Sequence, residues 1–243
     1  MTTAPRVVAA VDFSDASARA VAIAGFISQA CRGRLTLLHA ESVDAPLYFT
    51  SGQLDPLERE RQTSRAAAQA AVAQFGREHT PMSFSVEVIE QPPVDAIVEA
   101  SATADLIVMG THGRHGPARW WLGSVTERAM HEVLKPLLVV RSELPDPIET
   151  LFARMVVLAE SGSSGAHALE YARALAARCQ GTVFDERGAT IDQALERTRA
   201  TFAIVAAPHP GSAQWTGRFA ELLVRCCAVP LLFIPELVEG GAS

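Results

Sequence analysis

The chain has 243 residues, of which 49% are hydrophobic and 20% charged, and its formal net charge at pH 7 is −6. This length fits one large domain or two small ones, and the apolar content excludes a globally disordered chain. The negative charge argues against nucleic acid as the main partner, and no apolar run is long enough for a membrane span or a signal peptide, so we expect a cytoplasmic protein without a membrane partner.

Apolar runs alternate with amphipathic segments along the first part of the chain. Strands are expected at residues 7–11, 35–40, 83–89, 106–109 and 137–140. Helices are expected at residues 56–78, 94–102 and 124–134, and after Ser14 or Asp15, either of which can cap a helix N-terminus. Strands and helices that alternate in this way predict a doubly wound parallel sheet of the Rossmann-like α/β class.

The second part of the chain repeats the first in shortened form. Residues 6–33 align without gaps with residues 154–181, and PLLVV at 136–140 corresponds to PLLFI at 230–234. In this part, strands are expected at 155–159, 183–186, 202–206 and 231–234, and helices at 166–178, 191–200 and 217–228. We therefore predict two tandem α/β domains at residues 1–142 and 153–236, joined by a proline-containing linker at 143–152 and followed by a tail at 237–243.

The cysteines are Cys31, Cys179, Cys226 and Cys227, and none of them has CxxC spacing. This argues against zinc binding and thioredoxin-like redox chemistry. Cys226 and Cys227, adjacent in an expected apolar helix, are interpreted as small buried hydrophobic side chains, with a redox role as the alternative. His112 and His115 lack a nearby cluster of acidic residues or cysteines, so no metal site is predicted.

A glycine motif with the spacing G-x2-G-x9-G-S follows the strand at 106–109. Gly110 and Gly113 allow the backbone to turn and to approach a ligand without a Cβ atom in the way. Gly123, Ser124 and Val125 open a helix, where free N–H groups and the helix dipole attract anions. The alternative is a glycine-rich loop with an ordinary serine cap.

The motif differs from two better-known phosphate loops. It lacks the lysine of a Walker A loop, and it is not the GxGxxG of nicotinamide-binding proteins. A bound phosphate would depend on backbone amides and a hydroxyl, with Arg114 or Arg119 as the nearby cation.

Four segments together resemble the universal stress protein family: VDFS at 11–14, LLHA at 37–40, MGTHG at 109–113 and LGSVT at 122–126. The glycine spacing is similar to that of the ATP-binding branch, and the two-unit layout is similar to the tandem form of the family. The resemblance implies adenosine contacts from Asp12 and from the backbone near Ala10 and Ala40. For the phosphates it implies contacts from the following residues: Gly110, Gly113, Gly123, Ser124 and Val125, with Met109, His112 and Arg114 adjacent.

Asp12 also fits this role on its own chemistry, because a carboxylate just past a strand end can accept from a ribose hydroxyl or an adenine amino group. The alternative is a second N-cap beside Ser14. The second unit has Ala207, Pro210 and Arg218 where the first has Gly110, Gly113 and Ser124, so we expect no second nucleotide site.

These features predict an ATP-binding stress-response regulatory protein that acts through a nucleotide-dependent change of state or partner. The ligand is expected to be ATP, ADP or AMP, with or without Mg²⁺, and no catalytic residue is assigned. A weak ATPase or nucleotidyl-transfer enzyme of the same fold is the first alternative, and a nucleotide-free scaffold is the second. We expect a homodimer whose interface covers Trp120, Trp121 and the apolar residues 47–49. We also expect a protein partner, whose identity the sequence leaves open.

Overall fold

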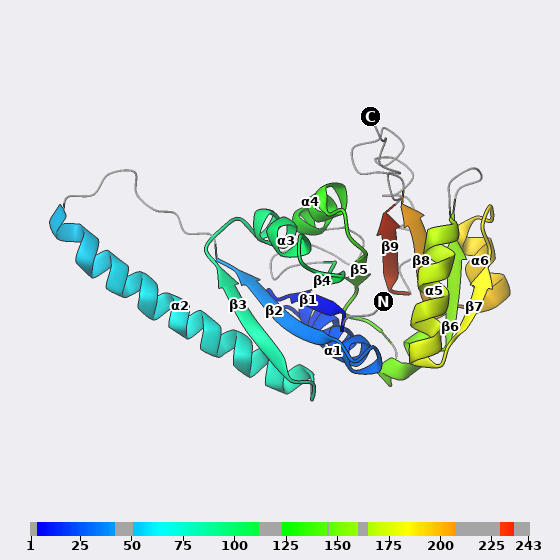
Figure 1. The fold of residues 1–243 in the computed structure, drawn as a ribbon, viewed down its shortest axis with the longest axis horizontal. Helices are drawn as coiled ribbons and strands as arrows, with labels where there is room; N and C mark the ends of the chain where they lie inside the picture. Colours follow the sequence, from blue (N-terminus) through cyan, green and yellow to red (C-terminus); the bar gives the residue numbers. More distant parts are fainter. Residues whose placement is uncertain are drawn as a thin grey trace.

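The computed structural model of the protein describes residues 4–41, 51–111, 123–144, 146–159, 165–207 and 229–235. Nine strands in these residues form one sheet in the order β3-β2-β1-β4-β5-β9-β8-β6-β7 (Figure 1). All neighbouring strands are parallel except β5 and β9, which are antiparallel. The fold is therefore the doubly wound α/β class predicted from the sequence.

The observed bounds lie close to the predicted ones. The strands are β1 Arg6–Ala10, β2 Arg34–Ala40, β3 Phe84–Ile89, β4 Leu106–Gly110, β5 Leu137–Val140, β6 Arg154–Leu158, β7 Thr182–Asp185, β8 Phe202–Ala207 and β9 Leu231–Pro235. The helices are α1 Asp15–Ala30, α2 Ser51–His79, α3 Pro93–Ser101, α4 Ser124–Glu132, α5 Ala166–Cys179 and α6 Ile191–Thr198, with a 3-10 turn η1 at Ile148–Phe152. The helix expected at 217–228 lies outside the described residues.

Helices cover both faces of the sheet. The core on one face is formed under α1, α2 and α5, and the core on the other face under α3, α4 and α6 (Figure 1). β1 shows how the sequence produces both layers, because Val7 and Ala9 point into the first core and Val8 into the second. This is the alternation expected of a strand that is buried on both sides.

The antiparallel pair β5–β9 joins two parallel sheets into one. Leu137 pairs with Phe233, Leu138 with Leu232 and Val139 with Leu231. Outward from this pair, the order β5-β4-β1-β2 on one side matches β9-β8-β6-β7 on the other. β3 has no counterpart among the described strands beyond β7, in line with the shorter second part of the sequence. The domain boundaries themselves stay a prediction.

The segment expected to be a linker contributes to the core instead of forming only a spacer. Its end forms η1, in which Leu151 and Phe152 are buried. Phe152 stacks on Phe26 of α1, with ring centroids 5.0 Å apart, and lies 5.1 Å from the ring of Phe202 in β8. The aromatic side chains therefore connect the two parts of the chain through η1.

α2 begins at Ser51, five residues earlier than the start predicted at residue 56. The sequence interpretation began the helix at Pro56, which is instead its sixth residue and lies in the second turn, where the missing N–H removes one hydrogen bond of the helix. In Figure 1 the first part of α2 extends past the edge of the sheet, and the second part packs beside β2 and β3.

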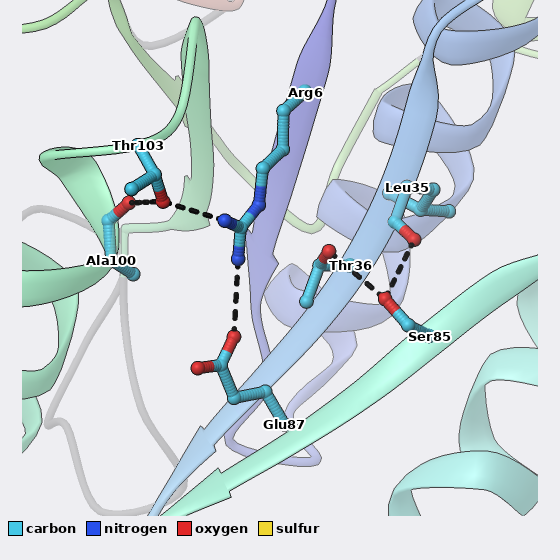
Figure 2. A network of polar contacts seen from close by, with 7 residues as sticks. All are labelled: Arg6, Leu35, Thr36, Ser85, Glu87, Ala100 and Thr103. Carbon is cyan, nitrogen blue, oxygen red and sulfur yellow. Dashed lines mark hydrogen bonds and ion pairs between the residues drawn. The ribbon is translucent and has the colours of Figure 1, made fainter.

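A polar network connects the first three strands on the α3 side of the sheet (Figure 2). The Arg6 guanidinium donates to Thr103 Oγ1 at 2.6 Å and to Glu87 Oε2 at 3.3 Å. Beside it, the hydroxyls of Thr36 and Ser85 are 3.0 Å apart. These contacts lie at the end of the sheet where β1 begins, away from the carboxyl ends of the strands, so we assign them a structural role.

In the described part of the chain, no helix combines the length and the apolarity that crossing a membrane requires.

Candidate nucleotide site

The candidate site lies where the direction of the chain through the sheet reverses. From β1 the chain proceeds outward through β2 to β3 and then returns to β4 on the opposite side of β1. In doubly wound sheets, ligands bind beyond the carboxyl ends of the strands at this switch point. Ala10, Ala40 and Gly110 end β1, β2 and β4 there, and all three are only partly buried.

Asp12 follows β1 at this edge and is exposed. Its Oδ1 accepts hydrogen bonds from the backbone N–H of Ser14 at 2.9 Å and from the Ser14 hydroxyl at 2.5 Å. Ser14 in turn caps α1, since its Oγ accepts from the N–H of Ser17 at 3.2 Å. Asp12 therefore does not cap α1 directly. It orients the residue that does, and no described residue donates to its other oxygen, Oδ2.

Phe13, next to Asp12, has a φ of 62°, which is rare for a bulky residue. Its ring packs edge-on against His39, at 4.9 Å, and Phe75, at 5.4 Å. His39 Nδ1 lies 2.7 Å from the carbonyl oxygen of Val11. Because a carbonyl can only accept, Nδ1 carries the proton, and the imidazole thus fixes the backbone just before Asp12.

Gly110 is close-packed against the first turn of α1. A Cβ atom at this position would lie 2.8 Å from Ala16 Cβ and 3.0 Å from the Ala16 carbonyl carbon. Gly110 does not have the positive φ that a glycine turn uses. Its first physical role is therefore to let β4 and α1 approach each other, whereas the sequence interpretation gave it a turn and an approach to a ligand.

Gly110 gives a direct prediction about stability. We expect Gly110→Ala to lower the free energy of unfolding by about 1–3 kcal/mol, because the added methyl group forces α1 to shift. Urea unfolding followed by circular dichroism measures this difference. Ala102→Gly, at an exposed position after α3, is the control for a change of one methyl group outside the core. An unchanged free energy for Gly110→Ala would show that the contact is loose.

The first turn of α4 is tied to the end of β4. The Thr126 hydroxyl donates to the Gly110 carbonyl oxygen at 2.9 Å, and the N–H of Gly123 donates to the carbonyl oxygen of Thr111 at 2.8 Å. Thr126 is buried, and the sequence interpretation gave it no role. A threonine in the first turn of a helix, on the side that faces the core, is the feature that could have indicated this hydrogen bond to the strand.

Gly123 is the N-cap of α4, and none of the side chains in the described ranges caps this helix end. The N–H groups of Ser124 and Val125 belong to the first turn, where the helix itself offers no acceptor. Ser124 is exposed and Gly123 and Val125 are partly buried, and the bonds to Gly110 and Thr111 place this helix N-terminus beside the end of β4. This arrangement suits an anionic group.

The remaining predicted residues divide into two groups. Met109 is buried in the core beneath α3 and α4, so only its backbone belongs to the site edge. His112, Gly113 and Arg114 lie outside the described residues, as do residues 47–49, Trp120 and Trp121, on which the expected dimer contact depends. Within the described ranges, no group of three or more His, Cys, Asp or Glu residues is placed to hold a metal ion.

The corresponding edge of the second part of the sheet is built differently. Ala207, fully buried, ends β8 at the position that Gly110 has in β4. At the end of β6, the Arg187 side chain packs beside Gly165 and Ala159. Its guanidinium forms two hydrogen bonds of 2.7 Å with Asp185, which lower the pKa of that carboxyl group. Pro210, Gly217 and Arg218 lie outside the described residues.

The fold and its strand order define an α/β protein with a doubly wound sheet. Residues 4–141, more than half of the chain, match the universal stress protein family, and the chain belongs to that family. A universal stress protein of Thermus aquaticus is 32% identical over 135 residues, which cover 54% of this chain and 95% of the relative.

A universal stress protein of Mycobacterium tuberculosis is 29% identical over 136 residues, or 56% of this chain. The match spans only 45% of that relative's length. Among solved structures, a universal stress protein from Archaeoglobus fulgidus superposes with a TM-score of 0.65 at 18% identity. This likeness covers 95% of this chain and 98% of that one, so the similarity of fold extends through both parts of the sheet.

Proposed function

We propose that this universal stress protein is a stress-response regulator that binds one adenine nucleotide at the switch point of β1 and β4. The observation that carries the proposal is the convergence of Asp12, the end of β4 and the uncapped N-terminus of α4 at one edge of the sheet. A carboxylate that accepts from a nucleoside at one end and helix amides that bind phosphate at the other complement the two ends of an adenine nucleotide.

The groups at this edge are preorganised before a ligand binds. His39 and Phe13 fix the backbone around Asp12, and Thr126 fixes the first turn of α4 to β4. Preorganised groups lose little entropy on binding, which increases affinity. Mg²⁺ would be brought by the nucleotide, and the protein would respond to occupancy through its state or its partner.

The same geometry supports slow turnover. Oδ1 of Asp12 already accepts two hydrogen bonds from Ser14, which hold the carboxyl group in place as a positioning group. Phosphoryl transfer generally needs metal ions and a residue that orients the attacking water. We therefore propose that the chain hydrolyses bound nucleotide slowly or not at all.

We expect one nucleotide per chain. In the second part of the sheet, Ala207 places a Cβ atom where Gly110 has none, and Arg187 packs over the end of β6. Isothermal titration of nucleotide-stripped protein with ATP, ADP and AMP measures the number of sites, with GTP as the control for base selectivity. Phosphate release under excess ATP measures turnover. Two equal sites per chain, or turnover on the order of 1 per second or faster, would refute the proposal.

The resident ligand can be identified directly. Mass spectrometry of the small molecules released when the purified protein is denatured distinguishes ATP, ADP and AMP. A protein that releases no nucleotide and binds none on titration would support the scaffold alternative instead.

A further inference from the structure

Cys31 and Cys179 end their helices in the same way. Cys31 follows α1 as its C-cap, and Cys179 is the last residue of α5. The next residue in each case, Arg32 or Gln180, has a left-handed backbone with φ of 53° or 58°. The two thiols are thus held at equivalent places in two equivalent helix ends, one in each part of the chain.

The fold brings these two helix ends together. α1 and α5 contact each other, and both contact η1, which lies beside their ends (Figure 1). Both cysteines are partly buried and pack against the core on this face of the sheet. Cys31 is also close enough to α5 for its thiol and three residues of that helix, Tyr171, Arg178 and Cys179, to influence one another's pKa. The helix contact therefore brings the first thiol near the part of α5 that ends in the second.

We propose that Cys31 and Cys179 are a dithiol pair that peroxide oxidises to a reversible disulfide between α1 and α5. The pair is not visible as a motif, because its members lie in separate parts of the chain and lack CxxC spacing. Their partial exposure gives a small oxidant access, and the contact between the helices keeps the second thiol near the first. The cross-link would lock together the two parts of the sheet that β5 and β9 join.

The reaction proceeds in two balanced steps. The Cys31 thiolate attacks a peroxide oxygen, so that an S–O bond forms, the O–O bond breaks and the departing hydroxide takes a proton to become water. Cys179 then attacks the sulfenic sulfur, the S–S bond forms and the second oxygen leaves as water. Together the thiols lose two electrons and two protons, and hydrogen peroxide is reduced to two waters.

Cys31 is the first thiol to react. Burial raises the pKa of both cysteines, to about 12 for Cys179, but the charge of Arg178 partly offsets this effect at Cys31. The thiolate is the nucleophile, so below the pKa of Cys31 the rate of oxidation should rise about tenfold per pH unit.

Peptide mapping of the full-length protein tests the pair. After treatment with hydrogen peroxide and alkylation of free thiols, trypsin should release residues 20–32 linked to residues 179–187. Dithiothreitol should separate this pair, and oxidised protein should unfold at a higher urea concentration than reduced protein. The Cys226→Ser, Cys227→Ser double variant should still form the link, and Cys31→Ser, checked for folding by circular dichroism, should not.

Three outcomes would overturn the proposal. The first is oxidised protein in which both peptides remain individually alkylated. The second is a Cys31 that proceeds to the sulfinic acid without any link. The third is a linkage of Cys31 to Cys226, to Cys227 or to another copy of the chain. None of these readouts depends on nucleotide binding, so failure here would leave the proposed function intact.

Discussion

Gly123→Val should abolish nucleotide binding while the fold is retained. Gly123 is the N-cap of α4, with φ −65° and ψ 143°, a conformation that valine adopts readily. A branched side chain there would occupy the place of the anion in front of the Ser124 and Val125 amides. Because hydrogen bonds to a charged group contribute about 1.5–3 kcal/mol each, the loss of two predicts roughly a 100-fold or larger loss of affinity. Calorimetric titration with ATP measures this difference.

Two further variants distinguish the effect of side-chain size at Gly123 from the contribution of the Ser124 hydroxyl. Gly123→Ala adds the smallest side chain and should give an intermediate loss, whereas Ser124→Ala removes a hydroxyl and leaves the amides open. Thermal unfolding of each variant checks that α4 is retained. An affinity of Gly123→Val within a few-fold of the parent would mean that the phosphates bind elsewhere.

Phe152→Ala should destabilise the whole chain. Phe152 is fully buried between Phe26 and Phe202, which belong to different parts of the chain. Replacing a buried phenylalanine by alanine costs about 3–5 kcal/mol through lost burial and the cavity that remains. Since domains are stabilised by about 5–15 kcal/mol in total, this is a large fraction of the free energy of unfolding.

Urea unfolding monitored by circular dichroism measures the effect of Phe152→Ala. We expect a single transition at a lower urea concentration, because one core cluster includes residues of both α1 and α5. Leu134→Ala is the control, since Leu134 is 60% exposed and its truncation should change the free energy by less than about 0.5 kcal/mol. A loss below about 1 kcal/mol for Phe152→Ala, or two separate transitions, would show that η1 does not couple the two parts.

The sheet was largely predictable because its strands are short apolar runs bounded by turn residues. The pattern could not show that the last residues of the expected linker are buried. Leu151 and Phe152 are two apolar residues after a proline-rich stretch, and only the presence of Phe26 and Phe202 nearby determines that they enter the core. The start of α2 was missed for a different reason, since proline is common at the first position of a helix, whereas Pro56 lies in the second turn of this one.

The sequence predicted which residues form the candidate site better than it predicted the contacts that hold them in place. Sequence spacing identified Asp12, Gly110 and Gly123, whose roles toward a nucleotide stay predictions. It did not show that Gly110 also packs against Ala16 of α1. His39 and Thr126 were left without a role, because their hydrogen bonds reach residues distant in sequence, Val11 and Gly110. Such contacts depend on tertiary distances that no local pattern contains.

The antiparallel contact of β5 with β9 has a thermodynamic consequence. Two separate chains that pair through edge strands obey mass action, so their association weakens on dilution. Here both strands belong to one polypeptide, and the intervening chain gives them an effective concentration that does not change with the amount of protein. The edge strand β5 of the first half therefore stays covered even when the protein is scarce. The second half can then differ from the first elsewhere, as long as it keeps β9, the strand that provides the cover.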